Sequence, residues 1–158
     1  MSLEAAKAHL AKHGLADRVI EFTVSSATVA LAAEALGCEE AHIAKSILLD
    51  QPDGVLLILA AGDAKIDNRK FKDRFVNKPK MMPFERVEEA VGHAPGGVCP
   101  FGAKEGVRIY LDQSLRRFTT VYPAAGNPSS AVRLSIEELE RASEALDWVD
   151  VCKLPETV

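Results

Sequence analysis

The sequence predicts an α+β fold, with a mixed, mainly antiparallel sheet and flanking helices. Two apolar, β-rich runs at residues 43–49 and 55–61 are separated by five residues of turn composition, which predicts a β-hairpin at the centre of the sheet. The other expected helices and strands follow one another without strict β-α-β alternation, which disfavours a doubly wound parallel sheet. Because the chain has 158 residues and no linker-like or low-complexity tract, residues 1–158 are expected to form one domain.

Local signals mark the ends of several elements. Gly14 follows a helix-forming segment and Gly37 follows an alanine-rich one, as expected at helix C-termini. Ser135, with Glu138 three residues later, has the pattern of a capping box and predicts the start of another helix. The expected helices cover residues 3–13, 28–36, 67–75 and 83–91 and a segment from residue 135. Beside the hairpin, the expected strands cover residues 19–24, 107–111, 119–122 and 131–134, with a short edge strand at 148–151.

Composition and charge exclude several classes of protein. Apolar residues make up 47% of the chain and charged residues 27%, which excludes a disordered or collagen-like chain. The net charge of −4 excludes a basic coat over the whole surface, although it allows a local patch. Residues 65–80 contain seven Lys or Arg and two Asp, a local charge of +5, so they form either a phosphate-binding face or a solvated helix face.

The sequence shows no feature of a secreted, membrane or metal-binding protein. Its start lacks a secretory signal, and its longest apolar run, residues 55–61, is too short to span a bilayer, so a cytoplasmic protein is expected. Three cysteines without a CxxC pair predict neither a disulfide framework nor a cysteine-rich zinc site. Cys38 and His42 have the spacing of two ligands on one helix turn, but no further ligand is evident, so no metal or cofactor is expected.

Lys45 is the first candidate functional residue. It lies in an otherwise apolar strand, on the same face as Ile43, Ile47 and Leu49. Burying an ammonium group is costly unless it reaches water or an anion. Lys45 is therefore either an anchor for a phosphate or a developing oxyanion, or an edge-strand lysine that extends to solvent.

Two loops rich in small residues are further candidates. Residues 95–102 contain three glycines and two prolines, which suits either a site that binds a carbonyl or hydroxyl group through the main chain or a structural connector. Cys99 in this loop is a possible nucleophile with His93 as its base, but no orienting Asp or Asn is evident. The segment 122–130 forms a tight turn that a ligand could approach.

These elements, in this order, resemble the YbaK/ProX family of aminoacyl-tRNA deacylases, relatives of the editing domain of bacterial prolyl-tRNA synthetases. The resemblance covers residues 5–146 and rests on three motifs. Lys45 in the sequence Ala-Lys-Ser-Ile-Leu matches the lysine of the family, and residues 96–102 match its Gly-Gly-x-x-Pro-x-Gly loop. Ala-Ala-Gly at 124–126, followed by a strand ending at Leu134 and a serine-capped helix, matches its C-terminal signature.

The resemblance implies a sheet curled into an open barrel and a trans-editing hydrolase. Such an enzyme cleaves the ester that joins a small wrong amino acid to the terminal adenosine of a tRNA, often a proline tRNA. Lys45 would anchor the 3′ end, and loop 96–102 would position the ester and its attacking water or ribose hydroxyl; this substrate-assisted chemistry needs no triad, metal or cofactor. The substrate contacts implied are Phe22, Ser46, Gly96, Gly97, Val98, Cys99, Pro100, Gly102, Ala125 and Gly126.

Departures from the family pattern leave the substrate open. Cys99 stands where many relatives have Ser, and Ala124 and Ala131 stand where some cysteinyl-specific relatives have Ser and Asp. A pocket edged by alanine, valine and Phe22 suits an amino acid the size of alanine, serine or cysteine. The alternatives are a non-catalytic module that binds tRNA 3′ ends or aminoacyl-nucleotides beside a synthetase, and a hydrolase that depends on Cys99. The oligomeric state is not predicted.

Overall fold

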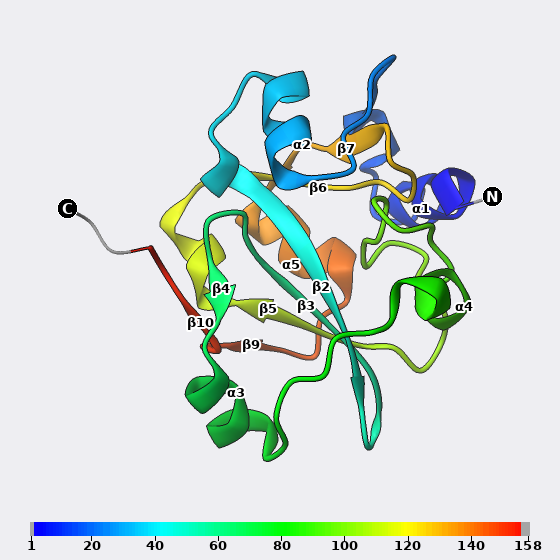
Figure 1. Cartoon of the computed structure of the whole chain (residues 1–158). Helices are drawn as coiled ribbons and strands as arrows, with labels where there is room; N and C mark the ends of the chain where they lie inside the picture. The colour runs from blue at the N-terminus through cyan, green and yellow to red at the C-terminus, as the bar shows by residue number, and fades with distance from the viewer. Residues whose placement is uncertain (1, 156–158) are drawn as a thin grey trace.

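A six-stranded sheet, with the strand order β8-β6-β2-β3-β5-β9, forms the centre of the computed structural model, which describes residues 2–155 (Figure 1). Two further pairs, β1 with β7 and β10 with β4, lie beside it. The strands are β1 (Val19–Glu21), β2 (Ile43–Gln51), β3 (Gly54–Ala61), β4 (Lys65–Ile66), β5 (Arg108–Asp112), β6 (Thr120–Pro123), β7 (Ser130–Val132), β8 (Leu134–Ser135), β9 (Asp147–Val149) and β10 (Cys152–Lys153). The helices are α1 (Ser2–Ala11), α2 (Val29–Leu36), α3 (Asn68–Phe75), α4 (Val87–Val91) and α5 (Ile136–Ser143). Short 3₁₀ segments are η1 (Ala16–Arg18), η2 (Glu40–His42), η3 (Phe84–Arg86) and η4 (Gln113–Arg117).

The predicted central hairpin is confirmed. β2 and β3 pair antiparallel from Ala44 opposite Ala61 to Gln51 opposite Gly54, with Lys45 opposite Ala60. Residues 56–61 of β3 have no exposed surface. A strand covered on both faces reads as a continuous apolar run, which is why this segment lacks polar alternation.

The sheet is mixed, as predicted. Within the six-stranded sheet, β2–β3 and β6–β8 are antiparallel, whereas β2–β6, β3–β5 and β5–β9 are parallel. The separate pairs β1–β7 and β4–β10 are antiparallel, so four of the seven pairings among residues 2–155 are antiparallel. β9 is an edge strand, as expected for the segment near Trp148. This combination of helices with a mixed, curled sheet confirms the α+β fold class.

The prediction of one continuous strand at residues 131–134 is wrong. Residues 131–134 do not form a single strand, because the chain changes sheets at Arg133. Before it, β7 pairs with β1, and after it, β8 pairs with β6. The Arg133 N–H donates to Arg18 O at 3.2 Å, one step beyond the last β1–β7 pair, so the apolar run is shared between two sheets.

Side-chain caps fix the helix starts that the sequence indicates. The Asp67 carboxylate accepts hydrogen bonds from the Arg69 and Lys70 N–H groups at the start of α3. The Ser135–Glu138 capping box is present at the start of α5. The helix expected at residues 83–91 is shorter than predicted: the 3₁₀ turn η3 precedes the five-residue α4.

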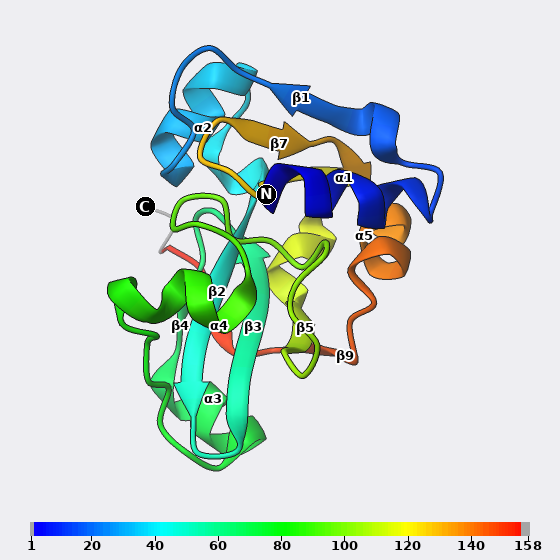
Figure 2. The same cartoon turned by 90° about the vertical axis from the view of Figure 1, so that its right-hand side faces the viewer.

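α2 and α3 lie at opposite ends of the molecule (Figure 1). α2 and η2 lie near the start of β2, whereas α3 lies at the far end of the molecule (Figures 1 and 2). Within residues 2–155, no helix combines the length and hydrophobicity needed to cross a membrane.

Candidate functional site

A pocket of about 180 Å³ lies where the start of α2, the start of β2, the 96–98 loop and the β6–β7 connection meet. It brings together parts of the chain that are about a hundred residues apart in sequence. The side chains that line it are mostly small and include five alanines, and its polar lining residues are Ser, Thr, Tyr and Lys. The lining residues are Ser26, Ala27, Thr28, Val29, Ala32, Ile43, Ala44, Lys45, Ser46, Gly96, Val98, Tyr122, Ala124, Ser130 and Ala131.

Lys45 lines this pocket, and its ammonium group is held from one side. The Lys45 Nζ donates hydrogen bonds to Ala64 O and, at 3.4 Å, to Gly62 O. An ammonium has three donors, so these two carbonyls fix its position and leave the third N–H for another acceptor. Burial lowers the pKa of Lys45 below its ordinary value, because desolvation penalises the charged form.

The turn that holds Lys45 depends on Gly62, which the sequence analysis does not identify. A Cβ on Gly62 would lie 2.0 Å from Glu40 O, so this position admits no side chain. Beside it, the Arg117 guanidinium donates to both oxygens of Asp63, at 2.6 and 3.1 Å. That hydrogen bonding lowers the pKa of Asp63 and keeps the carboxylate charged near the lysine.

Ser46 adds an unused polar group to the pocket. Its Oγ is buried and has no hydrogen-bond partner within residues 2–155. A buried hydroxyl without a partner costs free energy, and such groups are found where a ligand or water completes the hydrogen bonding. Ser46 is thus a lining residue, next to Lys45 in sequence, whose hydroxyl has hydrogen-bonding capacity to spare.

The segment before α2 is a part of the site that the sequence analysis missed. Thr28 is the N-cap of α2, and its hydroxyl accepts a hydrogen bond from the Leu31 N–H at 3.1 Å. The Ser26 N–H donates to Pro128 O at 2.7 Å, which brings this segment onto the β6–β7 connection. A Thr N-cap can be read from sequence, but its position beside Lys45 depends on packing.

The two glycine-containing segments identified in the sequence pack against each other. A Cβ on Gly97 would lie 2.4 Å from both N and Cα of Asn127 and 2.6 Å from the carbonyl carbon of Gly126. A Cβ on Gly96 would lie 2.9 Å from the Ala27 Cβ. The glycines therefore let three backbone segments approach one another beside the pocket.

Cys99 faces the interior, not the pocket. It has no exposed surface, and its Sγ lies 3.6 Å from both His93 Nε2 and Phe101 O. Burial raises the pKa of the Cys99 thiol to about 12, so the thiolate needed by a nucleophile is not formed near neutral pH. His93 is also fully buried, and desolvation lowers its pKa below the ordinary value.

Only some of the residues predicted to contact the substrate line the pocket. Lys45, Ser46, Gly96 and Val98 line the pocket, together with Ala124 and Ala131. Outside the lining are Phe22, Gly97, Cys99, Pro100, Gly102, Ala125 and Gly126. Phe22 follows the end of β1, and its N–H donates to Ser129 O at 2.8 Å.

Gly102 supports the loop from behind. A Cβ on this residue would lie 2.7 Å from Ala5 O of α1, and its φ is +69°. The end of the glycine loop is thus packed directly on the first helix.

The basic run 65–80 forms a second, separate surface. Lys70, Arg74 and Lys80 pair with Asp150, Asp147 and Asp50, at 3.1, 3.9 and 3.7 Å. Three other cations line a cleft with Asn68 and Pro79, and no ion pair within residues 2–155 neutralises them: Arg69, Lys72 and Lys78. This basic cleft borders α3, at the opposite end of the molecule from α2 (Figure 1).

Comparisons with known proteins agree with this fold. The family model of the aminoacyl-tRNA editing domain matches residues 23–142. The "Uncharacterized protein YwhH" of Bacillus subtilis (strain 168) is 46% identical over 154 residues, 97% of this chain and 98% of that protein. The proline–tRNA ligase of Shouchella clausii (strain KSM-K16) is 33% identical over 122 residues, 73% of this chain and 21% of the ligase.

A solved structure described as a proposed trans-editing enzyme for prolyl-tRNA synthetase superposes with a TM-score of 0.86 at 29% identity. The superposition covers 96% of this chain and 97% of the other. The family match spans the segment before α2, the lysine strand, the glycine loop and the β6–β7 connection, which together enclose the pocket. The chain belongs to the aminoacyl-tRNA editing domain family.

Proposed function

We propose that this protein hydrolyses the ester bond of a mischarged tRNA, and that the pocket around Lys45 holds the aminoacylated 3′ end. The observation that carries the proposal is that Lys45, whose Nζ donates to Gly62 O and Ala64 O, lines the same small pocket as Ser46 and Gly96. A lysine and small polar residues that line one small pocket suit an anionic nucleotide and a polarised ester carbonyl.

In the proposed reaction, water attacks the carbonyl carbon of the ester. The bond between that carbon and the ribose oxygen breaks, and the ribose oxygen takes the electron pair and a proton. The products are a free amino acid and a tRNA with a free terminal hydroxyl. Lys45 anchors the terminal nucleotide, and Gly96 and Val98 of loop 96–102 hold the ester in place, so catalysis comes from positioning and needs no nucleophile from the protein.

The pocket walls support a small amino acid as the group removed. Ala124 and Ala131 leave space without adding charge, and Val29 and Val98 make the remaining wall apolar. A side chain the size of alanine, serine or cysteine fits these walls. The names of the relatives support a proline tRNA as the carrier and a prolyl-tRNA synthetase as a partner. The proposed location is the cytoplasm.

A panel of mischarged tRNAs tests the proposal. The wild-type protein should release the amino acid from at least one of them, and Lys45→Ala should lower that rate by about a hundredfold or more. Lys12→Ala, which removes an exposed lysine outside the pocket, is the matched control and should keep the wild-type rate. Survival of every charged tRNA in the panel would refute the hydrolase, and tight binding without release would favour a non-catalytic 3′-end binding module.

A further inference from the structure

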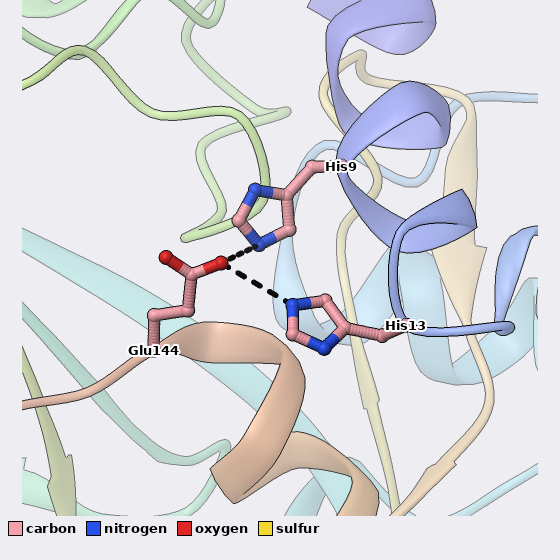
Figure 3. Close-up of side chains that lie close together, drawn as sticks. All are labelled: His9, His13 and Glu144. Carbon is pink, nitrogen blue, oxygen red and sulfur yellow. Dashed lines mark hydrogen bonds and ion pairs between the residues drawn. The ribbon is translucent and has the colours of Figure 1, made fainter.

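Two histidines and a glutamate converge on one point at the surface, away from the residues that line the Lys45 pocket. His9 is on α1, His13 follows one helical turn later, and Glu144 directly follows α5 (Figure 3). Their ligand atoms all lie within 4.8 Å of one another. The histidine side chains are mostly shielded, at 14% and 19% exposure, while Glu144 is 58% exposed.

The two distances from Glu144 to the histidines fit a tetrahedral metal ion. Glu144 Oε2 lies 3.2 Å from His9 Nε2 and 3.2 Å from His13 Nε2. In a tetrahedral site with metal–ligand distances of about 2.0–2.1 Å, neighbouring ligand atoms are separated by about 3.3 Å. Two imidazole nitrogens and one carboxylate oxygen are also a donor set that Zn²⁺ and similar divalent transition metals prefer.

The end of α5 adds a negative environment and a fourth polar atom, a carbonyl oxygen. His9 Nε2 donates to Ala142 O at 2.7 Å, in the last turn of the helix, where carbonyl groups have no intrahelical partner. The C-terminal end of a helix dipole favours a cation. A metal bound to His9 Nε2 would replace its proton and lie next to this carbonyl.

The conformation of Glu144 is a second, independent feature. Its φ is 55°, in the left-handed region that normally favours glycine at the end of a helix. The sequence therefore places a charged side chain where glycine would be less strained. That choice has a physical reason if the carboxylate is needed at this point.

We propose that His9, His13 and Glu144 form a binding site for a divalent transition metal ion, with Zn²⁺ as the ion that the donor set suits best. The ion ties α1 to α5. Because α1 also packs behind Gly102, and the His9 ring lies 6.1 Å from the Phe101 ring, the same ion steadies the support of the glycine loop. The proposal is independent of the deacylase activity.

Untagged protein titrated with Zn²⁺ by calorimetry, and with Co²⁺ by visible absorption, tests the site. One equivalent should bind, and His9→Gln or His13→Gln should each weaken binding at least tenfold. His42→Gln makes the same substitution at a histidine that packs on Phe118, outside the cluster, and should leave affinity within about twofold. Equal affinities in the wild type and in both cluster variants, or no binding to the wild type, would overturn the proposal.

Glu144→Gly tests whether Glu144 binds the metal ion or has only a structural role. Glycine relieves the left-handed conformation, so this variant should fold and be at least as stable as the wild type without metal. At a Zn²⁺ concentration a hundred times the dissociation constant, the wild-type melting temperature should rise by roughly 5–10 °C. The variant should lose most of that rise, and an undiminished rise would exclude Glu144 as a ligand.

Discussion

Gly97 lies so close to Asn127 that a single methyl group on the glycine would be 2.4 Å from both the N and the Cα of the asparagine. Gly97→Ala should therefore push the glycine loop away from the β6–β7 connection. We expect a loss of about 2–3 kcal/mol in the free energy of unfolding, as for other overpacked sites, and a strong fall in deacylation. Denaturant titration and the charged-tRNA assay measure the two effects.

Gly106→Ala is the control for the free-energy cost of placing alanine at a positive φ. Gly106 has a φ of +94°, but a Cβ there would meet no atom within 4 Å. This variant should lose only about 1–2 kcal/mol, the cost of a left-handed residue, and keep its activity. If Gly97→Ala behaves like this control, the close approach of the two loops does not matter for function.

The charge of Lys45 should make stability depend on pH. Desolvation lowers its pKa in the folded state, so the unfolded chain binds more protons in the window between the folded value and about 10.5. Stability contributed by this group therefore rises with pH through that window. Wild-type protein should gain stability relative to Lys45→Met as the pH increases from neutral toward 10.5, as measured by urea unfolding at several pH values. Parallel curves for the two proteins would contradict the lowered pKa.

Cys99 should be dispensable for catalysis. Its thiol is fully buried and has a pKa of about 12, so Cys99→Ala should keep the deacylation rate within about twofold and lose only some stability from the small cavity. Alkylation followed by mass spectrometry should label the partly exposed Cys38 in the folded protein and spare Cys99. A large loss of rate in Cys99→Ala with unchanged folding would revive the cysteine-dependent hydrolase.

Ser46 should matter for substrate and not for folding. Because its buried Oγ has no hydrogen-bond partner within residues 2–155, Ser46→Ala removes an unsatisfied group and should leave stability unchanged or slightly higher. If the hydroxyl contacts the substrate, KM for the charged tRNA should rise about fivefold to tenfold, a loss of about 1–1.5 kcal/mol of binding. Steady-state kinetics and thermal melting on the same preparation separate the two effects, and an unchanged KM would remove Ser46 from the site.

The basic cleft of Arg69, Lys72 and Lys78 should give a weak, salt-sensitive attraction to the tRNA body. β2 spans nine residues, about 30 Å, so this cleft and the pocket are far apart along the molecule. Lys72→Ala should weaken tRNA binding and reduce the slope of log affinity against log salt by about 0.7–0.9. Lys12→Ala is the control, and an affinity that does not change with salt would exclude the cleft from tRNA binding.

Patterns within short stretches of sequence were sufficient for most of the fold. The continuous apolar runs on each side of residues 50–54 gave the hairpin, because a strand buried on both faces needs no polar alternation. The Ser135–Glu138 cap marked α5, because its hydrogen bonds are local. Lys45 stood out because a cation in an apolar strand requires a reason.

The sequence could not show which strands pair with one another when they are short or distant in the chain. The pairing of β4 with β10 joins two-residue strands almost ninety residues apart, too short to produce a periodic signal. The division of residues 131–134 between two sheets also depends on what lies beside Arg133. Such features arise from packing between distant segments, which local composition does not encode.

The candidate site was determined partly by sequence and partly by tertiary structure. The sequence by itself identified Lys45, the glycine loop and the small-residue turn, because unusual residues in a strand or turn are visible locally. Only the tertiary structure showed that Ser26 and Thr28 line the pocket, that Cys99 is buried in the core and that His9 lies next to Glu144. Sequence specifies which groups a segment carries, whereas the direction that each group faces is decided when distant segments bury one another's surface.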